Sequence, residues 1–328
     1  MNKKTQKAPG YLEDENLSAG TKAFLKALNT SGGKPVESLP VKDARKVLEG
    51  AQSSVNVDLS GISEEEKTIE QDGHKFKIVV VRPQGAKGAL PAFLFIHGGG
   101  WVLGDYPTHK RLIRDLVVES GCAGVYVDYS RSPEAKFPKA TDECYAAIKW
   151  MAEHGKEIGI DPKRLAVAGN SAGGNMSLVT SIKAKENKGP KISVQILMWP
   201  VTDGGTDFDS FDIYGEERFL TTPLMKWMFD QYMSSPKDAK DIHLSPLRAS
   251  VEQLRGLPPT LIQVAENDIL RDEGEAMGRK LDEAGVDVTT IRYNGVIHDW
   301  GMLNGMAEIP QTKALILHAA SYLKKYLK

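Results

Sequence analysis

Residues 165–173 of this 328-residue chain read LAVAGNSAG, and the sequence NMSLVTSI follows at 175–182. The apolar run at 165–168 predicts a buried strand, and the residues from 172 onward predict a helix. A G-x-S-x-G sequence between a strand and a helix is typical of a tight turn that exposes a serine at the carboxyl edge of a sheet. We therefore expect Ser171 to be a nucleophile at such an edge.

A second glycine-rich stretch points to the same chemistry. Residues 97–101 read HGGGW and follow an apolar run at 92–96. The tetrahedral intermediate of acyl transfer carries an oxyanion, which backbone N–H groups must reach without side chains in the way. We expect this loop to supply one or two of these donors and the amide of Ala172, the residue after the serine, to supply another. A phosphate-binding loop would need G-x-G-x-x-G or a following Gly-Lys-Ser/Thr, which the stretch lacks.

The composition narrows the class of protein. A formal net charge of −1 gives no electrostatic reason to expect nucleic acid or an anionic membrane surface as a partner. No apolar stretch follows the basic residues near the N-terminus, and no run approaches the ~18 apolar residues of a membrane span. A cytoplasmic location is the expectation. Cys122 and Cys144 are expected as small buried hydrophobic residues, without a disulfide.

Strand and helix patterns alternate from about residue 68 onward. This alternation predicts a mostly parallel central sheet flanked by helices on both faces. Two short amphipathic helices are expected before it, at 21–28 and 41–48, with Ser38 as a candidate cap for the second. The expected strands are 75–81, 92–96, 123–128, 165–168, 194–198, 260–265 and 288–293, and the expected helices 109–120, 141–155, 172–185, 272–284 and 311–327.

An aromatic-rich segment after residue 202 interrupts this alternation. The chain is therefore divided into N-terminal helices (1–60), a first part of the core (61–202), an insertion (203–245) and a second part of the core (246–328). The insertion could be extra core, or it could be a lid over the active edge that the N-terminal helices join. On the second interpretation, five aromatic residues are expected to line the substrate pocket: Trp101, Phe208, Tyr214, Phe219 and Trp227.

A serine nucleophile needs a base, and a histidine at the carboxyl edge of the sheet is the candidate. His298 lies in the loop directly after the strand at 288–293. His154 and His318 fall within helical patterns and are expected to be surface or packing residues. His243, in the insertion, is a weaker alternative.

The base needs a carboxylate to orient it, expected from the loop after the strand at 260–265. Asp268 is the first aspartate of that loop, and Asp272 is the second choice. Asp272 and Glu273 are also well placed to cap the following helix, where its dipole favours negative charge.

Four motifs, HGGGW, GNSAGG, DILRDEG and GVIH, together resemble the hormone-sensitive-lipase-like family of α/β-hydrolases, which includes bacterial carboxylesterases. The resemblance runs from about Lys75 to the C-terminus. It implies an α/β-hydrolase fold, a Ser171–His298–Asp268 triad and a helical cap built from the N-terminus and the 203–245 insertion. It also implies Gly99, Gly100 and Ala172 as oxyanion donors.

The chain departs from the pattern of that family at three places. Asn170 stands where the family usually has Asp, and Asp299 and Trp300 replace a common Gly-Phe after the histidine. The sequence SRS at 130–132 replaces the usual Arg-Leu-Ala. None of these changes removes a catalytic group.

The sequence predicts a serine carboxylesterase that hydrolyses short-chain or aryl esters through a covalent acyl-enzyme. A small-molecule ester is the expected partner, no metal or organic cofactor is expected, and a homodimer is a possible assembly. An arylacetamide-type deacetylase or amidase would use the same triad. A non-catalytic ligand receptor on a hydrolase scaffold is the alternative from another class, and it would be expected to lack the serine or the histidine.

Overall fold

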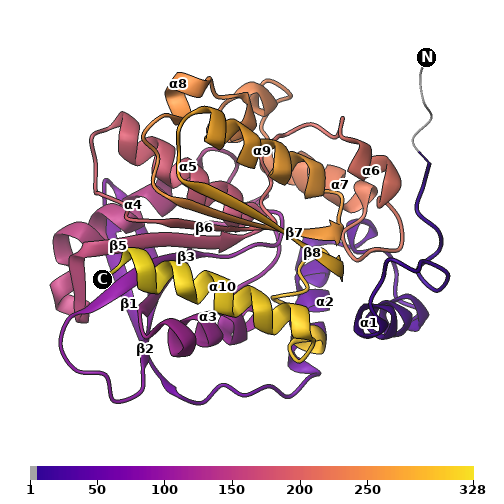
Figure 1. Cartoon of the computed structure of the whole chain (residues 1–328), viewed down its shortest axis with the longest axis horizontal. Helices are drawn as coiled ribbons and strands as arrows, with labels where there is room; N and C mark the ends of the chain where they lie inside the picture. Colours follow the sequence, from indigo (N-terminus) through magenta and orange to yellow (C-terminus); the bar gives the residue numbers. More distant parts are fainter. Residues whose placement is uncertain (1–5) are drawn as a thin grey trace.

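A mixed sheet of eight strands forms the centre of the computed structural model, which describes residues 6–328 (Figure 1). The strand order is β1-β2-β4-β3-β5-β6-β7-β8, and only β2 runs against the others. This arrangement confirms the expected fold class. The strands are β1 (Ile62–Gln71), β2 (His74–Pro83), β3 (Leu90–Ile96), β4 (Ala123–Asp128), β5 (Ile160–Asn170), β6 (Gln195–Met198), β7 (Thr260–Asn267) and β8 (Val288–Ile297).

Helices cover both faces of the sheet, as parallel strands require. One face carries α3 (Tyr106–Ser120) and α10 (Pro310–Tyr326), as Figure 1 shows. The opposite face carries α4 (Lys139–His154), α5 (Ala172–Glu186) and α9 (Arg271–Glu283). The four-residue helix α8 (Val251–Leu254) and short 3₁₀ turns occupy connecting segments.

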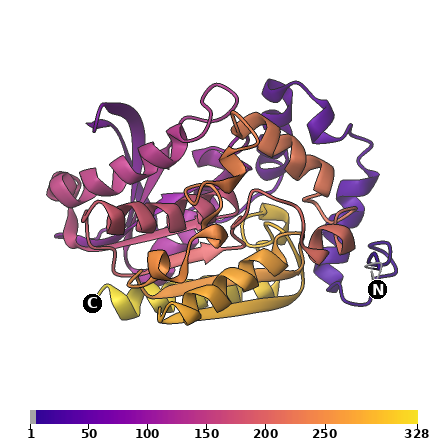
Figure 2. The same ribbon diagram turned by 90° about the horizontal axis from the view of Figure 1, so that it is seen from above.

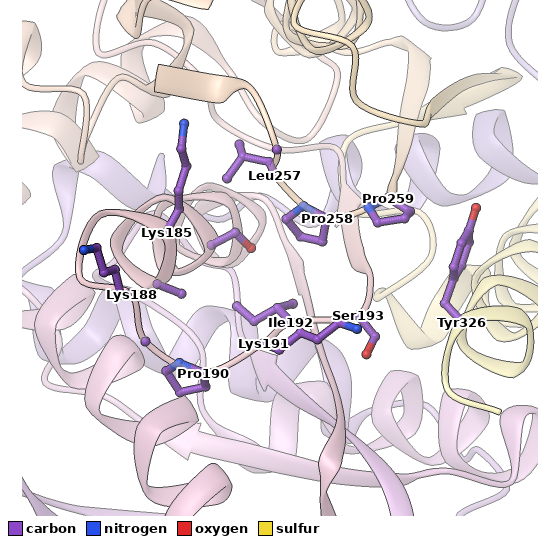
Figure 3. Close-up of a pocket in the computed structure, with 14 residues that line it drawn as sticks. Lys185, Lys188, Pro190, Lys191, Ile192, Ser193, Leu257, Pro258, Pro259 and Tyr326 are labelled. Carbon is purple, nitrogen blue, oxygen red and sulfur yellow. The ribbon is translucent and has the colours of Figure 1, made fainter. Parts of the chain in front are cut away.

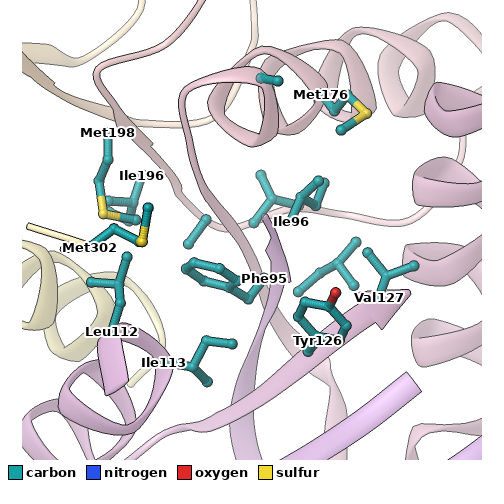
Figure 4. Packing of buried hydrophobic residues seen from close by; sticks show 14 of the residues in the cluster. Phe95, Ile96, Leu112, Ile113, Tyr126, Val127, Met176, Ile196, Met198 and Met302 are labelled. Carbon is teal, nitrogen blue, oxygen red and sulfur yellow. The ribbon is translucent and has the colours of Figure 1, made fainter. Parts of the chain in front are cut away.

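The core lies on both faces of the central strands. Successive side chains of a strand point to opposite faces, so Phe95 packs beside Ile113 of α3 whereas Ile96 faces Met176 of α5 (Figure 4). Residues 92–96 of β3 have no exposed surface. A strand buried on both faces needs a continuous apolar run, which is the pattern that the sequence shows at this strand.

Strand β1 is absent from the strands predicted by the sequence. Its residues read ISEEEKTIEQ, and only Ile69 among them is buried. The strand lies at the edge of the sheet and pairs with β2 alone. An edge strand that faces water on both sides carries no apolar period, so its pattern cannot reveal it.

Four helices from two distant parts of the chain gather at the carboxyl end of the parallel strands (Figures 1 and 2). They are α1 (Ala19–Thr30) and α2 (Val41–Ser53) of the N-terminal segment and α6 (Asp209–Ile213) and α7 (Thr222–Tyr232) of the insertion. The prediction that Ser38 caps α2 is wrong. Pro40 occupies the N-cap position of that helix and makes no side-chain hydrogen bond. Ser38 instead ends a short 3₁₀ turn, because Pro40 disfavours the helical conformation at Leu39, which is extended.

No helix within residues 6–328 combines the length and the apolar character that crossing a bilayer would require.

Candidate active site

Ser171 lies at the turn between the last residue of β5 and the first residue of α5. Its φ of 55° lies in the left-handed region, which a residue with a side chain rarely adopts. A β-carbon at Gly173 would lie 1.9 Å from the carbonyl oxygen of Ile96, so only glycine lets the helix start this close to β3. The strained turn therefore holds the hydroxyl of Ser171 at the carboxyl edge of the sheet.

The structure brings Ser171, His298 and Asp268 together from the ends of three strands. The Nε2 atom of His298 lies 2.9 Å from the Oγ atom of Ser171, and its Nδ1 atom lies 2.7 Å from Oδ2 of Asp268. The other carboxylate oxygen of Asp268 accepts the backbone N–H of Leu270 at 3.0 Å. All three side chains are buried. One nitrogen of the imidazole is thus set to take a proton from the serine while the other faces a carboxylate.

The weaker alternatives for base and acid make other contacts. The Nε2 atom of His243 lies 2.9 Å from a carboxylate oxygen of Glu186. Asp272 accepts the backbone N–H of Ser210 at 2.9 Å. Both acidic residues expected as helix caps lie in the first turn of α9, but the cap position belongs to Leu270, which makes no side-chain bond.

Two carboxylates act on the protonation of His298. Burial by itself would lower the pKa of the imidazole, but the negative charges of Asp268 and Asp299 and the hydrogen bond with Asp268 outweigh it. The net result is a pKa above the ordinary 6.5. The charged imidazolium that forms when the serine loses its proton is therefore stabilised in place.

Asp299 belongs to a buried hydrogen-bond chain that the sequence prediction missed. Its Oδ1 atom accepts from Nδ2 of Asn170 at 3.0 Å and from Nε1 of Trp199 at 2.7 Å. Asn170 in turn accepts the backbone N–H of Gly98 at 3.0 Å. The two departures from the family pattern at 170 and 299 are therefore partners, and their joint occurrence in the sequence was the available signal.

The glycine loop after β3 lines the same cavity as Ser171. Gly99 and Gly100 have φ values of 104° and 60°, and the carbonyl of Gly99 accepts the N–H groups of Val102 and Leu103. Within residues 6–328, the amides of Gly99, Gly100 and Ala172 donate to no protein acceptor. Three backbone donors thus remain free beside Ser171.

A cavity of about 770 Å³ opens onto Ser171, His298 and the two loop glycines. Its walls are mostly apolar side chains from both helical segments, and within the described residues no lysine or arginine lines it. Among the described residues, Asp299 supplies the carboxylate in its lining. The apolar side chains include Ala23, Phe24, Leu28, Val47, Leu48, Phe219, Leu220, Leu224, Met228, Leu303 and Ile309.

Of the five aromatic residues expected to line the pocket, Phe219 is the one that does. Trp101 is fully buried against Tyr232, and Tyr214 contacts Arg271 through its hydroxyl and ring face. Phe208 and Trp227 are partly buried outside the cavity. These four residues are absent from the cavity lining; for Trp227 the reason is that Leu224 and Met228 share the cavity face of α7, and Trp227 lies about 100° around the helix from Met228.

A second cavity, of about 630 Å³, lies near the amino ends of β6 and β7 and offers different chemistry (Figure 3). Its lining includes Lys185, Lys188 and Lys191 with Pro258 and Pro259. Within residues 6–328, no group of three or more His, Cys, Asp or Glu side chains is arranged to hold a metal ion.

Comparison with known proteins agrees with this geometry. Residues 93–302 match the family described as alpha/beta hydrolase fold. An ethyl acetate hydrolase from Pseudomonas putida is 31% identical over 308 residues, which cover 89% of this chain and 94% of that protein. The crystal structure of a thermostable esterase from Pseudomonas putida ECU1011 is 56% identical with a TM-score of 0.95, and the match covers 96% of this chain and 99% of that one.

A more distant solved structure agrees as well. A fungal esterase from Rhizomucor miehei is 38% identical with a TM-score of 0.90, over 95% of this chain and 97% of that chain. The similarity thus covers nearly the whole length, from the N-terminal helices to α10. With the eight-stranded sheet of the described residues and the serine turn after β5, it shows that the chain belongs to the alpha/beta hydrolase fold family.

Proposed function

We propose that this chain is a carboxylic ester hydrolase of the hormone-sensitive-lipase-like group, and that it acts on short-chain or aryl esters. One observation carries the proposal. Ser171, His298 and Asp268 form a continuous hydrogen-bonded series, with separations of 2.9 and 2.7 Å, at the base of a mostly apolar cavity. The relatives named above are an ethyl acetate hydrolase and esterases.

The reaction begins when Oγ of Ser171 bonds to the ester carbonyl carbon and its proton passes to Nε2 of His298. The carbonyl electron pair moves onto oxygen, where the amides of Gly99, Gly100 and Ala172 stabilise the negative charge. Asp268 holds the imidazole in its orientation and stabilises the imidazolium. His298 then gives the proton to the leaving alkoxide as the ester C–O bond breaks, leaving an acyl-enzyme on Ser171.

Water completes the cycle by the same steps. The oxygen of the water bonds to the acyl carbon while His298 takes a proton from the water. His298 then returns the proton to Oγ of Ser171 as the bond between Oγ and the acyl carbon breaks. The free acid leaves and the enzyme is restored. Every proton transfer of the hydrolysis thus passes through His298.

We also propose that residues 1–60 and 203–245 act as a cap over the cavity. The support for this division is that most of the apolar walls come from these two segments, including α1, α2 and α7. The cytoplasmic location and the homodimer stay predictions.

Hydrolysis of p-nitrophenyl esters beside the matching p-nitroanilides tests the function. We expect ester turnover well above anilide turnover, and labelling of the peptide that contains Ser171 by an organophosphonate. Ser171→Ala should lower kcat by roughly 10⁴-fold or more, because the members of a triad act as a unit. Absence of both turnover and labelling would favour the receptor, and faster anilide turnover would favour the amidase.

A further inference from the structure

Trp101 of the glycine loop is held by helix α7. Its ring stacks on the ring of Tyr232 with the centroids 4.1 Å apart and the planes 6° from parallel. Both side chains are fully buried. The backbone of Trp101 has a φ of 61°, a conformation that persists in a residue with a side chain only when its surroundings hold it. The stack with Tyr232 is such a restraint.

Met228, on the preceding turn of the same helix, packs against Gly100. A β-carbon at Gly100 would lie 2.0 Å from Sδ of Met228 and 2.5 Å from its Cγ. Met228 and Tyr232 are four positions apart, so they project from one face of the helix. Consecutive turns of α7 therefore contact consecutive residues of the loop, at the place where its amides are free.

Helix α7 is itself firmly anchored to the hydrolase core. Its carbonyl at Tyr232 accepts the backbone N–H of Phe137 at 2.9 Å, and Lys136 donates to the carbonyls of Asp230 and Met233. At the other end, the side chain of Thr221 caps the helix. The bonds with Phe137 and Lys136 attach α7 to the core at the end that carries Tyr232, which lets the helix hold the loop in one position.

We propose that Tyr232 and Met228 are positioning residues, through which helix α7 fixes the amides of Gly99 and Gly100 in the orientation that binds the oxyanion. The inference rests on the proposed ester hydrolysis and adds a role for the insertion besides roofing the cavity. Preorganised donors stabilise the transition state only when they already point at the developing charge. Looser packing on Trp101 and Gly100 should therefore weaken binding of the transition state more than binding of the ester.

The test compares the full-length wild-type protein with Tyr232→Phe and Tyr232→Leu. Rates with an aryl acetate are divided by the concentration of active sites, counted from the end point of phosphonate labelling. The hydroxyl of Tyr232 has no partner in the described part of the chain, so Y232F should retain kcat within about twofold. Y232L loses the ring, and kcat should fall roughly 10- to 100-fold with KM changed less than about threefold.

A trifluoromethyl ketone separates positioning from a merely structural role. Its adduct with Ser171 places an oxyanion among the loop amides, so its Ki in Y232L should rise by the factor by which kcat/KM falls. Equal Ki values in Y232L and Y232F, or equal kcat values, would overturn the role of α7. Failure of the wild-type protein to hydrolyse the acetate or to react with the phosphonate would instead reject the proposed function, and the inference with it.

If Y232L does not accumulate as folded protein, Met228→Ala carries the same test. This change removes the atoms packed on Gly100 and leaves the Trp101–Tyr232 stack in place. Because Met228 also lines the cavity, we expect the Ki for the ketone in M228A to rise more than the KM for the ester, and we expect recovery in M228L, whose volume is close to that of methionine. A wild-type Ki in M228A would contradict the proposal.

Discussion

Asp268 and Asp272 stand four positions apart after β7, yet only Asp268 contacts His298. Asp268→Asn should lower kcat on the order of 10³- to 10⁴-fold, because an amide there favours the wrong imidazole tautomer. Asp272→Asn is the matched control and should change kcat far less, since its partners are Arg271 and the amide of Ser210. Steady-state rates of the two variants with one ester check this, and the reverse ranking would assign the other carboxylate as the partner of the base.

The pH dependence of the reaction depends on the two carboxylates beside His298. The base must be neutral, so kcat/KM should rise with pH through the pKa of His298, which lies above 6.5. Asp299→Asn removes one of the charges that raise this pKa, so the midpoint should move to lower pH. Asparagine at 299 can still accept from Asn170 and Trp199, which preserves the local geometry.

Profiles of kcat/KM from about pH 5 to 9 for wild type and Asp299→Asn measure this shift. The exposed Asp241 lies outside the cavity and provides a control. Asp241→Asn should leave the midpoint of the pH profile unchanged. An unchanged or higher midpoint in D299N would show that Asp299 does not act on the base.

Among the elements, α1 forms a wall of the cavity through Phe24, whose ring meets Phe219 edge to face with centroids 6.2 Å apart. We expect activity to peak at acyl chains of about two to eight carbons and to fall steeply beyond. Burial of each methylene that fits the cavity contributes ~0.8 kcal/mol of binding free energy, whereas a methylene that does not fit costs roughly 1–3 kcal/mol of strain. Phe24→Ala should move the peak to longer chains because it enlarges the cavity.

The acyl-length profile with p-nitrophenyl esters measures this change. Lys26 lies on the exposed side of the same helix, so Lys26→Ala is the matched control. We expect its acyl-length profile to match that of the wild-type protein. An identical profile in F24A and K26A would mean that α1 does not limit the acyl group. A preference of the wild-type protein for long-chain triglycerides would contradict the capped cavity itself.

At the scale of the whole molecule, a buried ion pair joins the N-terminal segment to the insertion. Arg218 donates to Asp14 at 2.7 Å, and both side chains are at most 2% exposed. Removing one partner of a buried pair leaves an unpaired charge, which typically costs about 3–5 kcal/mol. Arg218→Met should therefore lower the free energy of unfolding by this order, or detach the N-terminal segment before the core unfolds.

Urea unfolding followed by circular dichroism, with limited proteolysis of the N-terminal segment, distinguishes these two outcomes. The exposed pair of Lys7 and Glu216 joins the same two segments, and Lys7→Met should change stability by less than about 1 kcal/mol. Equal effects of R218M and K7M would show that burial of the Arg218–Asp14 pair adds nothing.

The sequence by itself determined the alternating fold, the serine turn and the order of the candidate triad. These features are local: the turn at Ser171 needs glycines two positions away, and parallel strands bring the residues that follow them to one edge. An apolar run likewise identifies a buried strand such as β3 without knowledge of its neighbours.

Only the tertiary structure decided which side chains surround the candidate site. Trp101 stands in the glycine loop, yet its ring stacks on Tyr232 rather than facing the cavity. Phe24 of α1 meets Phe219 of the insertion across almost two hundred positions of sequence. The apolar period of a helix shows which residues share a face, but the face that meets the cavity depends on how distant helices pack, and that packing is not encoded within any one segment.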